Sequence, residues 1–227
     1  MLIKTIPGWS LPERKATPEN VFWNRREFSK RAATGAILGA TGIGFGENLY
    51  VSKGWGAEDP LADLFPASRN KRYVLDRPLT PKHLVTTYNN FFEFGSHKNV
   101  WKSAMQLPLR PWQLRFDGLV EKPITLDVDA LIRKMALEER LLRHRCVEAW
   151  SIAVPWTGFP LKSLVDIARP LSGAKYLKMT GFNMPEIAKG QRQTWLPWPY
   201  VEGLTVEEAV NELTMIVVGA YGQPLPH

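Results

Sequence analysis

The sequence contains a single cysteine, Cys146, among its 227 residues. One cysteine excludes an internal disulfide framework and any zinc site built from cysteines alone. A long basic run is missing too. Residues 58–227 carry twenty-one Lys/Arg against eighteen Asp/Glu, so more than half of the formal charge of +7 lies in residues 1–57. Nucleic acid is therefore not an expected partner, because its binding requires a concentrated positive surface.

The sequence is also short of uncharged stretches that could cross a membrane. The uncharged stretch that follows Arg31 is fifteen residues long and rich in alanine and glycine. A membrane-spanning helix needs about 20 apolar residues. We therefore expect no transmembrane span in this chain.

This stretch is instead typical of an export signal, because paired arginines, Arg25 and Arg26, precede it. Together with Phe28 and Lys30 they resemble a twin-arginine signal. A basic amphipathic helix is the alternative, but each interior glycine costs a helix roughly 1 kcal/mol relative to alanine. We expect residues 1–57 to be a twin-arginine signal peptide and leader, and the mature protein to be periplasmic.

Cys146 follows three side chains that are or can be cationic: Arg143, His144 and Arg145. Nearby positive charge favours the thiolate, which is the nucleophilic and metal-binding form of cysteine. This stretch therefore suits a single soft metal ligand or a nucleophile. The alternative is a buried cysteine that acts as a small hydrophobic side chain, and the local sequence does not decide between them.

A second candidate segment, residues 87–95, gathers one tyrosine, three phenylalanines, two amides and one carboxylate. In a loop, such side chains can bind a polar ligand by hydrogen bonds and stacking. They can equally form a loop that is packed by its own aromatic rings.

Periodicity and capping signals predict a mixed α+β fold with short helices over sheets and long loops. Alternating or β-rich segments predict strands over 112–118, 140–147, 174–180 and 214–219. Helices are predicted over 160–168, from a cap at Asp127 to about 135, and from a capping box at Thr205 to about 212. Residues 58–110 show little periodicity, so we expect an irregular stretch.

Taken together, the motifs of the body resemble the catalytic subunits of bacterial periplasmic protein-methionine-sulfoxide reductases, within the sulfite-oxidase-fold family of molybdenum enzymes. The resemblance extends from about residue 78 to the end. The matching motifs lie at residues 88–95, 145–151, 154–156, 158–161, 199–204 and 221–222.

The resemblance implies a sulfite-oxidase-type molybdopterin-binding fold over 58–227 and a Mo-molybdopterin cofactor. It assigns Cys146 as the catalytic thiolate on molybdenum, which agrees with the preference of such metals for soft ligands. A threonine after Lys175 binds the cofactor in the family; Thr180 is the nearest one here, although ungapped counting reaches Gly181. The implied cofactor-binding residues are Asn89, Phe92, Glu93, Cys146 and Thr180.

The implied reaction is the reduction of methionine sulfoxide in oxidised periplasmic proteins, with electrons from a haem-containing membrane subunit. Relatives continue beyond the position of His227 with residues that grip the pterin phosphate, so we expect the domain to be incomplete at its C-terminus. Two alternatives follow. One is a sulfite dehydrogenase-like molybdoenzyme, which an arginine-rich anion pocket would favour. The other is an inactive truncated remnant that binds a partner but no metal.

Overall fold

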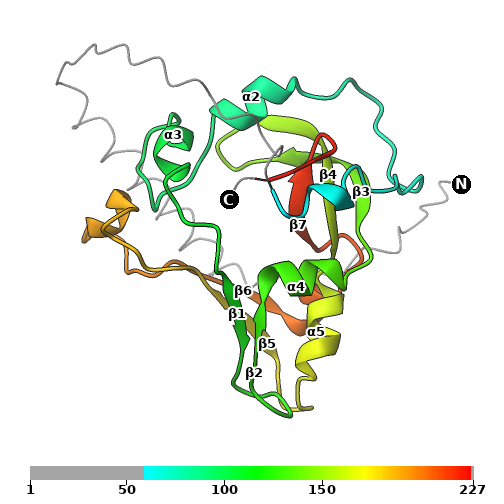
Figure 1. The fold of residues 1–227 in the computed structure, drawn as a ribbon, viewed down its shortest axis with the longest axis vertical. Helices are drawn as coiled ribbons and strands as arrows, with labels where there is room; N and C mark the ends of the chain where they lie inside the picture. Colours follow the sequence, from blue (N-terminus) through cyan, green and yellow to red (C-terminus); the bar gives the residue numbers. More distant parts are fainter. Residues whose placement is uncertain (1–58, 226–227) are drawn as a thin grey trace, which may run out of the picture.

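The computed structural model describes residues 59–225, and the leader predicted over 1–57 lies outside them. The strands are β1 (Gln113–Phe116), β2 (Ile124–Asp127), β3 (Glu138–Arg145), β4 (Ser151–Pro160), β5 (Tyr176–Thr180), β6 (Val201–Thr205), β7 (Met215–Ala220) and β8 (Gln223–Pro224). The helices are α2 (Lys82–Thr87), α3 (Trp101–Ala104), α4 (Val128–Arg133), α5 (Lys162–Ala168) and α6 (Val206–Ala209), with 3-10 turns η2 (Ala62–Leu64) and η3 (Lys189–Arg192). This mixture of short helices and sheets confirms the predicted α+β class (Figure 1).

A four-stranded antiparallel sheet in the order β3-β4-β7-β8 forms the centre of the fold, and the pairs β1-β2 and β5-β6 form two separate ribbons. The β3–β4 hairpin is paired from Glu138 and Gly158 to Arg145 and Ser151. A bulge lies at Gly158, where β4 meets β7. A side chain at this glycine would collide with the backbone of Ile216, so the close approach of the two strands requires glycine.

The main hydrophobic core lies between this sheet and the helices α4 and α5, which stand next to the ribbons in Figure 1. Phe159 of β4 is 1% exposed and packs with Ile132 of α4 and Leu164 of α5. Burying such a side chain contributes roughly 1.5–3 kcal/mol. These contacts fix β4, and with it the hairpin that presents Cys146.

A second core packs the aromatic segment against the stretch that follows β5. The rings of Phe91 and Phe94 meet edge to face at 4.9 Å, and Phe91 lies 6.1 Å from Phe182. Val100 and Ala188 are fully buried in the same cluster. The aromatic rings therefore do pack against their own loop, which is the alternative to ligand binding given above. This packing does not involve the polar side chains of the segment.

The outer edge of β3 is covered by residues 68–70. Asn70 N–H donates to Glu139 O at 2.8 Å, and Glu139 N–H donates to Ser68 O at 2.9 Å. Arg140, 3% exposed, bonds the carboxylate of Glu138 and the carbonyl of Glu212. Covering an edge strand in this way removes a row of unpaired backbone groups that would invite aggregation.

The two capping signals placed the starts of α4 and α6 correctly. Asp127 accepts from Ala130 N–H, and Thr205 forms the capping box with Glu208, as predicted. Three predicted spans are wrong at one end: α4 ends at Arg133, α5 begins at Lys162, and α6 ends at Ala209. The helix α6 stops early because the chain turns at Asn211, whose carbonyl accepts from Thr214 N–H just before β7. Helices α2 and α3 also interrupt the stretch predicted to be irregular.

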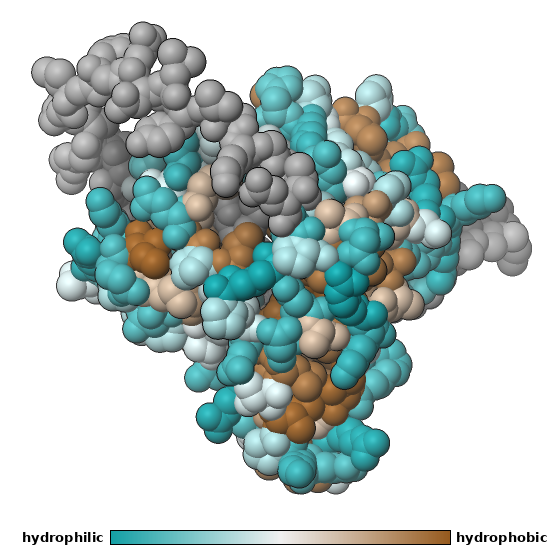
Figure 2. Space-filling view, in the orientation of Figure 1, coloured by the Kyte–Doolittle hydropathy of each residue, from teal (hydrophilic) through white to brown (hydrophobic). Residues whose placement is uncertain are grey.

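Within residues 59–225, no helix is both long and apolar enough to cross a membrane. The surface in Figure 2 is mostly hydrophilic, with an apolar area over the two ribbons.

Candidate functional site

Cys146 is the first residue after β3, so the predicted strand 140–147 begins and ends two residues too late. Its N–H donates to Trp150 O at 2.9 Å, and its carbonyl accepts from Ala149 N–H at 3.1 Å, which closes a tight loop between β3 and β4. Ala149 has φ of 69°, a left-handed conformation that is uncommon for a residue other than glycine. The thiol is free and half-buried, so it is accessible as a ligand.

The same loop carries Glu148, whose carboxylate oxygen Oε2 accepts three hydrogen bonds. The donors are Lys98 Nζ at 2.8 Å, Asn90 Nδ2 at 3.0 Å and Trp150 Nε1 at 3.0 Å. The Lys98 ammonium, followed by the Asn90 amide, lowers the pKa of Glu148 to about 2. Charge-assisted bonds of this kind are stronger than neutral ones. They join the Cys146 loop to the aromatic segment, fifty residues earlier in the chain.

Asn89 lies at the base of that aromatic segment. Its backbone N–H donates to Lys98 O at 3.0 Å, and its side-chain Nδ2 donates to Val85 O at 2.9 Å. Its Oδ1 is buried and has no hydrogen-bond partner among the residues the structure describes. A buried acceptor without a donor is costly, so this atom indicates a ligand that would donate to it.

The tip of the segment carries Phe92 and Glu93, which touch η3 and the end of β5. Gly190 of η3 lies against their backbone: a Cβ there would stand 2.8 Å from Glu93 O and still closer to Phe92 O. Glu93 Oε1 lies near Gly181, 4.0 Å from where a Cβ of that glycine would be. Burial raises the pKa of Glu93, so its carboxyl holds a proton to higher pH than an exposed glutamate.

Thr180 ends β5, is exposed, and lines a cavity of about 820 Å³ between the two ribbons and α5. Across residues 59–225, no hydrogen bond or ion pair joins Thr180 to Cys146. Its neighbour Gly181 reaches Glu93 instead, and its N–H donates to Tyr200 O at 2.9 Å. Of the two positions left open by the sequence, Gly181 thus lies beside Glu93, another of the candidates.

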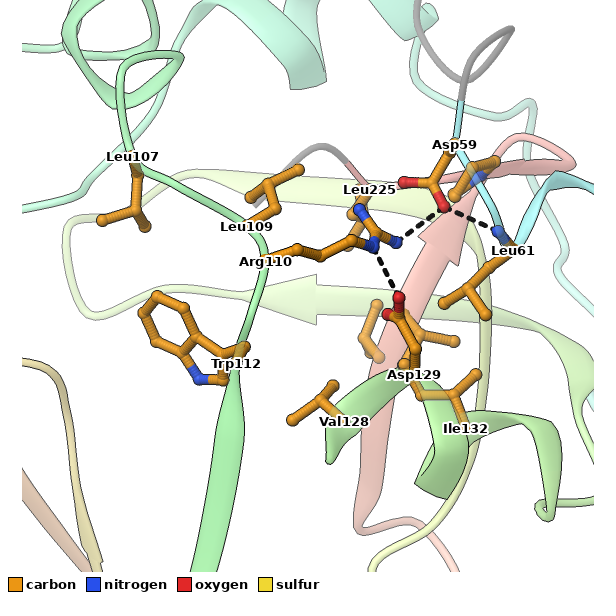
Figure 3. Close-up of a pocket in the computed structure, with 13 residues that line it drawn as sticks. Asp59, Leu61, Leu107, Leu109, Arg110, Trp112, Val128, Asp129, Ile132 and Leu225 are labelled. Atoms are coloured by element: carbon orange, nitrogen blue, oxygen red, sulfur yellow. Dashed lines mark hydrogen bonds and ion pairs between the residues drawn. The ribbon is translucent and has the colours of Figure 1, made fainter. Parts of the chain in front are cut away.

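A smaller cavity of about 240 Å³ lies next to the larger one, and Trp112 lines both (Figure 3). Arg110 enters it between two carboxylates, with Nε 2.5 Å from Asp129 Oδ2 and Nη2 2.9 Å from Asp59 Oδ1. The Asp129 hydrogen bond raises the pKa of Arg110. Because Arg110 is already paired with two carboxylates, we interpret its role as structural. We do not interpret the cavity as an anion-binding site.

Sequence reasoning missed Lys98 as part of the site, and it named Asn90 and Glu148 only within motifs. No spacing rule could have found them, because Lys98 and Glu148 are fifty residues apart and meet only through the fold. In the part of the chain that the structure describes, no three His, Cys, Asp or Glu side chains cluster as metal ligands. The candidate groups are thus the thiol of Cys146, the unpaired amide oxygen of Asn89 and the partly buried carboxyl of Glu93.

Comparisons with known proteins complete the description of the site. A family model described as an oxidoreductase molybdopterin binding domain matches residues 102–227. The protein-methionine-sulfoxide reductase catalytic subunit MsrP of Burkholderia mallei is 38% identical over 236 aligned positions, which cover 100% of this chain and 69% of that protein. The sulfane dehydrogenase SoxCD from Paracoccus pantotrophus matches with 17% identity and a TM-score of 0.44, over 80% of this chain and 48% of that chain.

Proposed function

The chain belongs to the family of oxidoreductases with a molybdopterin-binding domain, and from this premise we propose that it reduces methionine sulfoxide in proteins. The family match confirms the molybdopterin-binding fold and the cofactor expected from the sequence. The observation that supports the substrate is the 38% identity, over the whole chain, to a protein-methionine-sulfoxide reductase catalytic subunit. Sulfoxide formation is reversible through dedicated reductases.

The residues present fit this cofactor. Cys146 offers a free, half-buried thiol, and a soft thiolate suits molybdenum. Asn89 Oδ1 is a buried acceptor that lacks a donor among the described residues, and a pterin carries N–H groups that could donate to it. In this proposal Cys146 holds the metal, while Asn89, Phe92 and Glu93 hold the pterin, with Gly181 or Thr180 beside them.

The reaction takes an electron pair and a proton pair, breaks the S–O bond of the sulfoxide, and releases a thioether and water. When bound, the molybdenum cofactor supplies the oxygen-atom acceptor and the redox chemistry. The protein's own contribution is to fix Cys146 and to supply a group that can hold a proton. Glu93 suits the second task, because partial burial keeps its carboxyl protonated to higher pH than usual.

The cellular setting belongs to the same proposal. The paired Arg25 and Arg26 support export by the twin-arginine route, a route suited to proteins that fold with a cofactor before they cross the membrane. In the periplasm the substrates would be oxidised envelope proteins. A haem-containing membrane subunit would supply the electrons.

The decisive experiment compares the parent with Cys146→Ser. We expect the parent to contain molybdenum and to reduce methionine sulfoxide with a chemically reduced dye as donor. The serine variant should lose about 100-fold or more in turnover, because even the groups that hydrogen-bond to metal ligands commonly contribute about 10- to 100-fold, and Cys146 would be a ligand itself. Near-parental turnover in the variant would show that Cys146 is only a packed side chain, and a parent without molybdenum would favour the inactive remnant.

The same preparation tests the sulfite dehydrogenase-like alternative. Arg143 and Arg145 are both exposed at the end of β3, on either side of His144. Cationic side chains at this place keep sulfite, an anion, as a second candidate substrate. Sulfite oxidation that exceeds sulfoxide reduction would overturn our choice of substrate.

A further inference from the structure

The loop that carries Cys146 is short and locally strained. It turns within five residues, and Ala149 takes a left-handed φ of 69°. Such a conformation costs a non-glycine residue roughly 1 kcal/mol or more and persists only when its surroundings hold it. Val147 at the tip is 67% exposed, so packing of that side chain does not hold the loop.

What holds the loop is the carboxylate of Glu148. Its Oε2 accepts from Asn90 of the aromatic segment at 3.0 Å and from Lys98, three residues beyond that segment, at 2.8 Å. It also accepts from Trp150 at 3.0 Å within the loop itself. Lys98 Nζ also donates to Asn90 Oδ1. One carboxylate oxygen therefore ties the two sides of the loop to a segment fifty residues away.

The backbone of Lys98 also bonds the backbone of Asn89. The N–H of Asn89 donates to Lys98 O at 3.0 Å. Lys98 therefore bonds Asn89 through its backbone carbonyl and Glu148 through its side-chain ammonium. Asn89 is thus one residue from a donor to Glu148, while Cys146 is two residues before Glu148. The ion pair fixes the relative position of the two candidate cofactor residues.

We propose that Glu148 is a positioning residue, whose carboxylate, with Lys98 and Asn90, holds the Cys146 loop against the segment that carries Asn89. The inference rests on the proposed function for the role of Cys146, but its first test needs no cofactor. Loss of the carboxylate frees the loop without unfolding the hairpin, since β3 and β4 remain paired from Glu138 to Arg145.

Alkylation of the thiol measures this freedom directly, because Cys146 is the only cysteine of the chain. The full chain, prepared without molybdenum, is treated with iodoacetamide over a range of pH. The midpoint of the rate profile reports the thiol pKa, and the plateau at high pH reports access to the thiolate. This separation matters, because removing a negative charge near Cys146 can change the thiol pKa without moving the loop.

We expect the plateau rate to rise about five-fold in Glu148→Gln and in Lys98→Met, which corresponds to losing a partly exposed ion pair. Lys98→Arg keeps the charge and should stay near the parent rate. The matched control is Glu121→Gln, the same chemical change in an exposed ion pair with Arg169, and it should have no effect. All rates are compared well below the thermal midpoints, because loss of the Glu148 carboxylate, whose pKa is lowered in the fold, should also lower the midpoint of Glu148→Gln.

Two further measurements keep the result interpretable. High salt should speed alkylation of the parent but not of Glu148→Gln, because salt screens a partly exposed pair. In chains grown with molybdate, Glu148→Gln should retain several-fold less molybdenum than the parent. An unchanged plateau rate, an equal rise in Glu121→Gln, or a rise that occurs only near the thermal midpoint would each overturn the inference. A parent that lacks molybdenum would instead count against the proposed function.

Discussion

Gly190 gives the sharpest test of how the aromatic segment is positioned. A Cβ at this glycine would stand 2.8 Å from Glu93 O, 2.9 Å from Glu93 C and closer still to Phe92 O. Real Cβ atoms essentially never approach backbone atoms below 3.0 Å, and backbone cannot rotate aside as a flexible side chain can. Gly190→Ala must therefore push η3 away from Phe92 and Glu93.

The cost can be estimated from overpacking. Inserting one methyl group into a packed site typically costs about 1–3 kcal/mol. We expect the upper value, about 3 kcal/mol, because the added Cβ would collide with backbone atoms, which cannot rotate away. Gly173→Ala is the matched control, because nothing lies within 4 Å of its added Cβ and its φ is not left-handed. That variant should be neutral or gain up to about 1 kcal/mol through a less flexible unfolded chain.

Urea unfolding of both variants measures the difference, with molybdenum content as a second readout. We expect Gly190→Ala to lose stability and cofactor together, since the same displacement moves Glu93. Equal unfolding midpoints for the two variants would refute the close backbone contact on which this description of the segment depends.

Three other predictions follow from single groups. Burial raises the pKa of Glu93 above its value in the unfolded chain. The stability contributed by its protonated form is therefore lost as pH rises through the folded pKa. In urea unfolding, Glu93→Gln should exceed the parent in stability near about pH 7 but not near about pH 4. Arg140→Met should cost about 2–4 kcal/mol, because Arg140 is buried and paired with Glu138, whereas the same change at the exposed Arg133 should cost much less stability in urea unfolding. Replacing both Arg25 and Arg26 by lysine keeps the charge, yet should retain the protein in the cytoplasm; unaltered periplasmic yield by fractionation would exclude a twin-arginine signal.

The sequence was most informative where structure depends on near neighbours. The caps at Asp127 and Thr205 were predicted correctly because each bonds a backbone N–H three residues ahead. The strand β4 was not predicted, since Pro155, Gly158 and Pro160 all disfavour strands in isolation. Contacts with two neighbouring strands override this preference in the folded protein.

The candidate site shows the same division. Cys146 and the 87–95 segment stand out in the sequence by their chemistry, and their assignment to a molybdenum cofactor came from the resemblance of several motifs together. The ion pair of Glu148 with Lys98, which connects the Cys146 loop to this part of the chain, could not be predicted. Nothing in the sequence distinguishes these two residues from other charged residues. Their meeting depends on where the β3–β4 hairpin and the second core place the two loops.

The central claim is that the Cys146 thiolate binds molybdenum. X-ray absorption at the molybdenum edge tests it most directly, by counting the sulfur atoms bound to the metal in the parent and in Cys146→Ser. We predict that the parent shows one metal-bound sulfur more than the dithiolene of the pterin supplies, and that the serine variant, where it retains metal, lacks this sulfur. A parent whose molybdenum is bound only by dithiolene sulfur, or a serine variant with an unchanged sulfur count, would contradict the account.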